Sequence, residues 1–325
     1  MLAKYVLFVV VGFFLLIKGA DYLVDGSCGI ARRFHIPEMV IGLTLVSIGT
    51  SMPELFVSAG SALKGQSDMS VGNVIGSNIC NLFLILGLTA VIRPVPIPKS
   101  SKKIDIPICV SCTILLAILA NLGNIVNRLD GFILVTGFVG FIGYNVYASL
   151  KHREQINNSE KINKEELTER QESNRSKKLI KDILSMIGGI AALKIGGDFV
   201  VDNATLIAEY FSVPQTVIAL TIVALGTSLP ELVTSVVAAT KGETDIALGN
   251  VVGSNICNIL LVLGVTSLLT NVPYTTEYNL QLGILLIGTI ILPFFPIIDS
   301  RNSLSRSNGL VYLLLYALYS VLLFV

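Results

Sequence analysis

Ten long apolar segments dominate this 325-residue chain. Each has about 18 residues or more, the length that crosses about 30 Å of hydrocarbon as an α-helix. Hydrophobic residues make up 53% of the chain and charged residues only 14%, which is far from the composition of a soluble domain. We therefore expect an all-α integral membrane protein with ten transmembrane helices, near residues 5–25, 39–63, 70–92, 104–123, 130–149, 179–205, 216–240, 247–269, 280–298 and 308–324.

A charged segment at residues 151–178 separates the first five apolar segments from the last five. It carries eight Lys or Arg and six Glu with almost no apolar content, as expected of a solvated linker. The chain thus divides into a first half, residues 1–150, the linker, and a second half, residues 179–325.

The loop charges predict the orientation of the helices. If the N-terminus lies outside, seventeen Lys and Arg face inward and only three face outward. Because basic residues are enriched in cytoplasmic loops, we expect both termini outside and the linker in the cytoplasm. The net charge of +1 and the lack of a basic run interleaved with aromatics argue against nucleic-acid binding. The lipid bilayer is the expected environment, and no obligate protein partner is evident.

The two halves contain an internal repeat. Shifting the chain by 177 residues superimposes residues 19–89 on residues 196–266 without a gap, and 37 of these 71 positions are identical. Since each repeat has an odd number of spans, equivalent helices enter the membrane from opposite sides. Inverted repeats of this kind are typical of secondary transporters, whose binding site lies near the midplane where the repeats meet.

The second apolar segment of each repeat contains a proline followed by a carboxylate, in GTSMPE at 49–54 and GTSLPE at 226–231. Pro53 and Pro230 cannot donate a backbone hydrogen bond, so each predicts a helix break. An ionised Glu at membrane depth costs on the order of 3 kcal/mol or more without compensation. Two such residues, Glu54 and Glu231, at equivalent positions therefore indicate a cationic ligand.

The next apolar segment of each repeat adds a polar stripe, in GNVIGSNICN at 72–81 and GNVVGSNICN at 249–258. Its members recur every four residues and are Asn73, Ser77 and Asn81 in the first repeat and Asn250, Ser254 and Asn258 in the second. Hydrogen bonding between helices is the alternative role for these side chains. The glycines between them are spaced to let a neighbouring backbone approach closely.

The chemistry of these motifs narrows the choice of ligand. They offer carboxylates, carbonyls, hydroxyls and amides, and neither His of the chain lies in a predicted span. Oxygen ligands suit hard cations such as sodium and calcium, and calcium accepts six to eight of them in forgiving geometry. Two ionised glutamates balance one divalent ion.

The doubled GTS-x-PE and GN-x-x-GSN-x-x-N blocks resemble the repeats of the calcium/cation antiporter superfamily, and most closely its prokaryotic sodium/calcium exchanger branch. The resemblance implies alternating exchange of sodium for calcium in the plasma (inner) membrane of a prokaryote. It also implies that the first and sixth helices slide across the other eight. The implied calcium-binding residues are Glu54, Glu231, Thr50 and Thr227, the last two through their carbonyls. By the same resemblance sodium would be held with the help of Ser51, Ser77, Ser228 and Ser254, and the predicted ion-binding set also includes Asn81 and Asn258.

One departure from the family pattern leaves the coupling ion open. Some relatives carry an aspartate where this chain has Asn258, so the site here holds two formal negative charges instead of three. Calcium/proton exchange therefore stays open as an alternative, and a passive cation channel is a further one. We expect no enzyme activity, because the site is duplicated like for like, and no cofactor, because calcium and sodium would be transported ions.

The five cysteines lie in or beside apolar segments, where buried packing is the expected role. Cys109 and Cys112 form a lone C-x-x-C, which is a weak signal of metal or redox chemistry.

Overall fold

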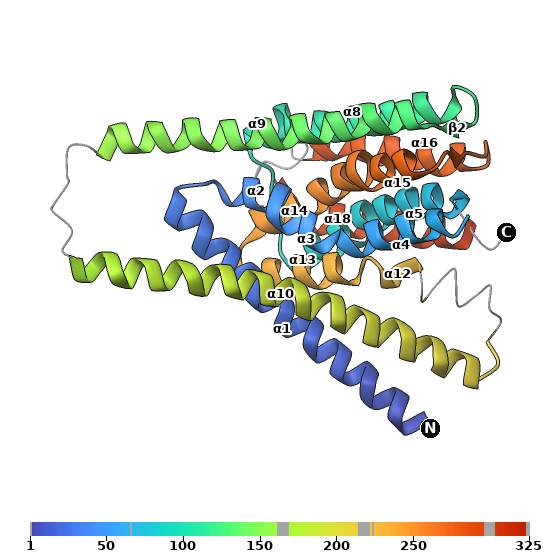
Figure 1. Ribbon diagram of the computed structural model, residues 1–325, viewed down its shortest axis with the longest axis horizontal. Helices are drawn as coiled ribbons and strands as arrows, with labels where there is room; N and C mark the ends of the chain where they lie inside the picture. The colour runs from blue at the N-terminus through green and yellow to red at the C-terminus, as the bar shows by residue number, and fades with distance from the viewer. Residues whose placement is uncertain are drawn as a thin grey trace.

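The computed structural model describes residues 2–65, 67–160, 169–213, 222, 224–295 and 303–322. Figure 1 shows a bundle of helices flanked by two long helices that cross each other, α1 (Leu2–Phe34) and α10 (Glu169–Tyr210). Two antiparallel strand pairs join loops of the two halves: β1 (Val95–Pro96) with β4 (Ser303–Leu304), and β2 (Ile125–Val126) with β3 (Val272–Pro273).

The remaining helices follow in chain order. In the first half they are α2 (Glu38–Ile41), η1 (Gly42–Val46), α3 (Ser47–Thr50), α4 (Met52–Leu63), α5 (Asp68–Ile79), η2 (Cys80–Ile85), α6 (Leu86–Ile92), α7 (Lys99–Lys103), α8 (Asp105–Asn121) and α9 (Arg128–Glu160). In the second half they are α12 (Ala224–Gly226), α13 (Leu229–Lys241), α14 (Thr244–Cys257), η4 (Asn258–Leu263), α15 (Gly264–Leu269), α16 (Tyr278–Ile291), η5 (Leu292–Phe294) and α18 (Arg306–Leu322).

The predicted all-α membrane fold is confirmed. Six helical stretches in the described residues are long and apolar enough to span a bilayer, and a seventh is the bent pair Glu38–Thr50 and Met52–Leu63. The predicted segment at 216–240 includes residues 216–221, which lie outside the described part of the chain. The count of ten spans stays a prediction.

Small residues let α1 and α10 pack with their backbones close together. A Cβ placed on Gly12 would lie 2.8 Å from the carbonyl oxygen of Gly196, and one on Gly189 would lie 2.7 Å from that of Gly19. A larger side chain would push the helices apart, because such contacts leave no room for a methyl group. These glycines therefore fix how the two long helices cross.

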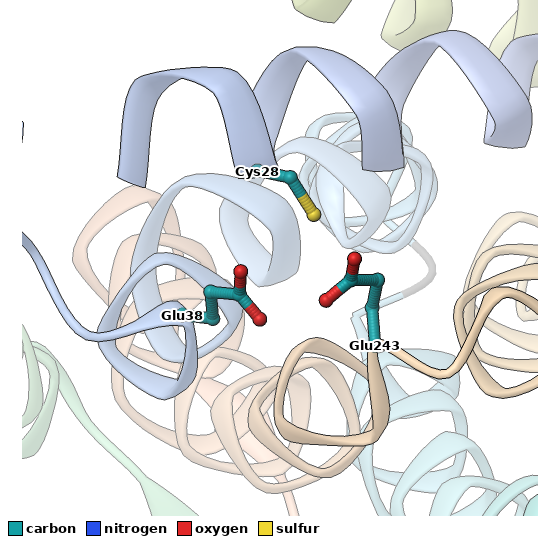
Figure 2. Close-up of side chains that lie close together, drawn as sticks. All are labelled: Cys28, Glu38 and Glu243. Carbon is teal, nitrogen blue, oxygen red and sulfur yellow. The ribbon is translucent and has the colours of Figure 1, made fainter. Parts of the chain in front are cut away.

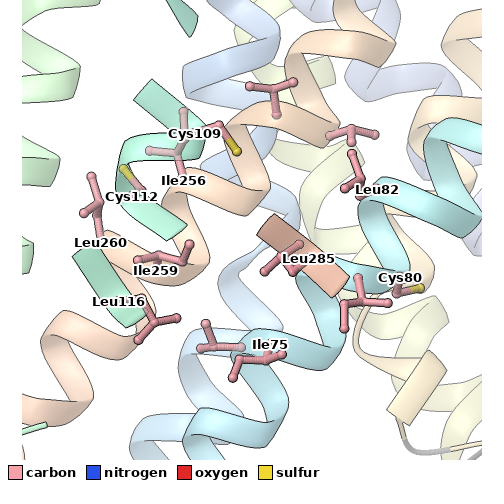
Figure 3. Close-up of a cluster of buried hydrophobic side chains, with 14 of the residues drawn as sticks. Ile75, Cys80, Leu82, Cys109, Cys112, Leu116, Ile256, Ile259, Leu260 and Leu285 are labelled. Carbon is pink, nitrogen blue, oxygen red and sulfur yellow. The ribbon is translucent and has the colours of Figure 1, made fainter. Parts of the chain in front are cut away.

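The bundle core forms where helices of both halves interdigitate. Figure 3 shows part of it, with side chains from α5, η2 and α8 meeting those of α14, η4 and α16. Ile75, Ile256 and Ile259 are each at most 1% exposed. A second cluster packs α1 and α10 against α13 through Leu16, Leu23 and Leu193.

The segment predicted as a linker is partly occupied by extensions of its flanking helices. α9 continues to Glu160 and α10 begins at Glu169, while residues 161–168 lie outside the described range. In Figure 1 both helices extend beyond the bundle on the same side, which we call the linker side.

Candidate ion-binding site

The predicted break in the second helix of each repeat is present. In the first repeat α3 ends at Thr50, α4 begins at Met52, and the two segments are bent by 42°. In the second repeat α12 ends at Gly226 and α13 begins at Leu229. The junction residue Ser51 has φ −82° and ψ 4°, and its equivalent Ser228 has φ −89° and ψ 6°. The same proline-dependent turn therefore forms twice.

Both glutamates lie in the first turn of the helix that follows this break, and each is 0% exposed. Each accepts a hydrogen bond from the junction serine of the other repeat. Ser51 Oγ donates to Glu231 Oε1 at 3.1 Å, and Ser228 Oγ donates to Glu54 Oε1 at 3.3 Å. The positive end of each helix dipole favours a carboxylate there. The break thus brings Glu54, Glu231, Ser51 and Ser228 together across the repeat interface.

Several buried polar atoms of the same motifs make no hydrogen bond to another protein atom. They are Glu54 Oε2, Glu231 Oε2, Ser77 Oγ, Ser254 Oγ, Thr227 Oγ1, Asn81 Oδ1, Asn81 Nδ2 and Asn258 Oδ1. An unsatisfied buried polar group costs about 1–3 kcal/mol of folding free energy. The presence of this many unsatisfied atoms in one set of motifs therefore requires an explanation. Most of them are oxygens, the ligand atoms that hard cations prefer.

The two buried carboxylates also require a counter-charge. No Lys, Arg or His in the described residues forms an ion pair with Glu54 or Glu231. Ionised groups buried without a partner are strongly unfavourable, and two like charges near each other add repulsion. A divalent cation would remove both penalties at once.

The helices that carry the polar stripes change geometry within one residue of the same repeat position. A π-helical stretch begins at Cys80, just before Asn81, and another begins at Asn258. Such stretches widen the helix locally and are frequent at functional sites. Cys80 and Cys257 are buried as predicted, but they lie next to Ser228 and Ser51 respectively, a placement that the sequence does not indicate.

Asn78 and Asn255, which are not among the residues predicted from the sequence to bind ions, connect the repeats. Asn78 Nδ2 donates to the carbonyl of Asn255 at 3.2 Å, and Asn255 Nδ2 donates to that of Asn78 at 3.3 Å. Asn258 Nδ2 also donates to Asn78 Oδ1 at 3.1 Å. Asn78 and Asn255 each follow the serine of a GSN motif. Their recurrence in both repeats is the sequence signal that could have identified them. The polar stripes thus also bond helix to helix, as the alternative reading expected.

The predicted close approach at the stripe glycines is found in the second repeat. A Cβ on Gly249 would lie 2.7 Å from the carbonyl oxygen of Met39, and one on Gly253 would lie 2.7 Å from that of Leu43. The equivalent contact of the first repeat would involve residues 214–221, which lie outside the described residues.

Comparison with known proteins identifies a matching family and several relatives. The family model described as sodium/calcium exchanger protein matches residues 4–147 and 181–325. The chain is 32% identical to the sodium/calcium exchanger MaX1 of Methanosarcina acetivorans, with 98% of each chain covered. It is 34% identical to the inner membrane protein YrbG of Escherichia coli, over 87% of this chain and 86% of that protein.

A solved structure has the same fold over the whole length. It is the sodium-calcium exchanger NCX_Mj soaked with zero Na⁺ and Ca²⁺, with a TM-score of 0.84 and 31% identity, covering 99% of this chain and 100% of that chain.

Proposed function

The chain belongs to the sodium/calcium exchanger family, a family of multi-pass membrane transporters, and from this premise we propose that it exchanges calcium for sodium at one site built on Glu54 and Glu231. The observation that carries the proposal is the pair of fully buried glutamates, one from each repeat, that lack a basic partner in the described residues. Relatives named as sodium/calcium exchangers support the choice of ions.

Calcium would bind between the two glutamates. Their unpartnered Oε2 atoms supply two charged ligands, and the carbonyls of Thr50 and Thr227 at the helix breaks would add neutral ones. This set suits calcium because calcium takes six to eight oxygens in flexible geometry, whereas magnesium requires a stricter octahedron. The charges of the two carboxylates equal that of one calcium ion.

Sodium would use hydroxyl oxygens around the same carboxylates. Ser77 and Ser254 have unpartnered Oγ atoms, and Ser51 and Ser228 already contact the glutamates. Asn81 and Asn258 would complete the set with amide oxygens. Since both ions need the same carboxylates, they would compete, which is what an exchanger requires.

The contacts of α1 favour a state that is closed on the linker side. α1 packs against α13, and Lys241 of α13 pairs with Asp21 at 3.2 Å and with Asp25 at 2.8 Å. At the mirror positions, Asp198 pairs with Lys194 of its own helix at 2.6 Å, and no ion pair joins Lys64 to α10 within the described residues. We propose that transport alternates between this arrangement and its mirror image.

The proposed setting follows from the loop charges. The two five-helix repeats, residues 1–150 and 179–325, would lie in a prokaryotic plasma membrane with both termini outside and residues 151–178 in the cytoplasm. YrbG is named as an inner membrane protein, which supports this location.

Calcium-45 uptake into proteoliposomes tests the exchange. One set carries an outward sodium gradient and the other an outward proton gradient of equal size. We expect sodium to drive uptake and protons to fail. Uptake driven by protons alone would replace sodium with protons as the coupling ion, and uptake without either gradient would indicate a passive channel.

A further inference from the structure

A second cluster of metal-ligating side chains lies at the end of α1. Its residues do not belong to the ion-binding motifs described above. Cys28 Sγ and carboxylate oxygens of Glu38 and Glu243 all lie within 4.8 Å of one another. Figure 2 shows the thiol and both carboxylates pointing into one space. The three residues come from different elements: α1, the first residue of α2, and the turn before α14.

The charge of this cluster is only partly balanced. Arg32 Nη2 lies 2.8 Å from Glu243 Oε1, and Arg32 Nε lies 3.5 Å from Glu38 Oε1. Within the described residues these two ion pairs set one guanidinium against two carboxylates, and the negative charge of Asp245 also acts on Glu38. The Arg32 side chain is 68% exposed, so it can swing into solvent without disturbing the core. A cation can therefore replace it.

The ligand types select the class of metal. Cys28 is only 5% exposed and directs a sulfur toward the carboxylates, whose side chains are 25% and 22% exposed. Zinc accepts Cys sulfur together with carboxylate oxygens and leaves a fourth position for water, whereas calcium takes oxygen ligands. The partly exposed carboxylates can rotate inward to reach zinc bond lengths.

The internal repeat does not duplicate this cluster. Applying the 177-residue shift, the positions of Cys28, Glu38 and Glu243 correspond to Thr205, Gln215 and Gln66, and Arg32 corresponds to Glu209. The motifs of the transport site are duplicated, but these residues are not. The cluster is therefore a one-sided feature of the molecule, separate from the duplicated site.

We propose that Cys28, Glu38 and Glu243 bind a zinc-class divalent ion, and that the bound ion clamps α1 to α2 and to the turn between α13 and α14. Zinc binding itself is independent of the exchange reaction. Its consequence rests on the proposed function: if α1 must slide during exchange, the clamp holds the state closed on the linker side and slows transport.

Zinc binding to the purified full-length chain tests the site directly. Titration against a chromophoric zinc chelator should give one zinc per chain, and X-ray absorption should show one sulfur at about 2.3 Å with oxygens at about 2.0–2.2 Å. Cys28→Ser and Glu243→Gln should each lower the zinc affinity about tenfold or more. Glu243 lies in a turn, so its variant tests the site even if the buried Cys28→Ser change disturbs folding.

Two controls separate this cluster from the transport site. Cys257→Ser removes a buried cysteine next to Ser51 and should leave the zinc–sulfur contact intact. The double variant Glu54→Gln, Glu231→Gln should retain zinc affinity. Three results would overturn the proposed site: loss of zinc binding in that double variant, a zinc coordination shell without sulfur, or unchanged zinc affinity in Cys28→Ser.

A transport assay tests the clamp. Zinc should slow sodium-driven calcium uptake by the parent chain but not by Cys28→Ser, which should transport at the parent rate without zinc. Equal inhibition of both proteins would overturn the clamp. If protons prove to be the coupling ion, the zinc-binding results still decide the site on their own.

Discussion

The two repeats carry the same residues at the candidate site, but they do not make the same contacts. Thr50 Oγ1 donates to Asn250 Oδ1 at 3.1 Å, whereas its equivalent Thr227 has an unpartnered Oγ1. The equivalent asparagines make matching bonds: Asn250 Nδ2 donates to Ser235 Oγ at 3.0 Å, and Asn73 Nδ2 donates to Ser58 Oγ at 3.0 Å. However, Asn250 is 0% exposed, whereas Asn73 is only partly buried. The carboxylate region is thus symmetric and its surroundings are not.

Symmetric ligands with asymmetric surroundings would let one sequence pattern serve the two states of the proposed exchange cycle. A site in which each repeat supplies the same ligands looks the same when the repeats exchange conformations. In the proposed cycle the asymmetric contacts, such as Lys241 with Asp25 at 2.8 Å, would then define which side is closed. We therefore expect substitutions in the symmetric part to have equal effects in both repeats, and substitutions in the asymmetric part to have unequal ones.

The largest effect is expected at the glutamates. Glu54→Gln and Glu231→Gln should each reduce sodium-driven calcium flux by about 100-fold or more, because removing one partner of a buried charge cluster costs about 3–5 kcal/mol. Calcium-45 uptake into proteoliposomes measures it. Near-normal flux in one of the two variants would break the symmetry of the site.

The asparagines that join the repeats should respond unequally. Asn78→Ala leaves Asn258 Nδ2 without its acceptor and removes one of two donors to the carbonyl of Asn255, which still accepts from the backbone N–H of Asn258. Asn255→Ala removes only a side-chain donor to the carbonyl of Asn78. Because an unsatisfied buried donor costs about 1–3 kcal/mol, Asn78→Ala should lower the melting temperature in detergent more than Asn255→Ala does. Equal shifts would show that the extra bond from Asn258 contributes nothing.

The stripe serines should affect sodium and spare stability. Since Ser77 Oγ and Ser254 Oγ bond to no protein atom, Ser77→Ala and Ser254→Ala should leave the melting temperature unchanged. Each should raise the sodium concentration for half-maximal exchange by roughly tenfold, the equivalent of about 1.4 kcal/mol. A lower melting temperature with unchanged sodium dependence would assign these hydroxyls to packing.

The smallest effect is expected at the ion pairs that hold α1. Lys241→Met should raise amide hydrogen exchange in α1 and α13 on the linker side by up to about fivefold, because partly exposed ion pairs contribute at most about 1 kcal/mol. The mirror variant Lys64→Met is the matched control and should leave exchange in α4 and α10 unchanged. Equal responses at Lys241 and Lys64 would contradict a one-sided state.

The sequence predicted those parts of the molecule that depend on local chemistry. Apolar length predicted membrane helices, and Pro53 and Pro230 predicted the breaks, because a missing backbone donor acts on its own helix whatever surrounds it. The repeat predicted that Glu54 and Glu231 would be equivalent. These features needed no knowledge of which side chains meet across helices.

The remaining features depend on tertiary contacts that periodicity does not encode. The cross-repeat bonds from Ser51 and Ser228 and the reciprocal bonds of Asn78 and Asn255 arise only after the repeats dock. The approach of Glu243 to Cys28 and Glu38 joins residues more than two hundred positions apart along the chain. The asymmetry between Thr50 and Thr227 is a property of one conformation, so identical motifs could not reveal it.

Calcium-binding stoichiometry distinguishes one site shared by both repeats from two separate sites. Equilibrium dialysis of the purified chain with calcium-45, in the absence of sodium, should give one calcium per chain, and Glu54→Gln and Glu231→Gln should each abolish it. Two calcium ions per chain, or one ion retained in either single variant, would mean that each repeat has a site of its own and would contradict a single site shared by both.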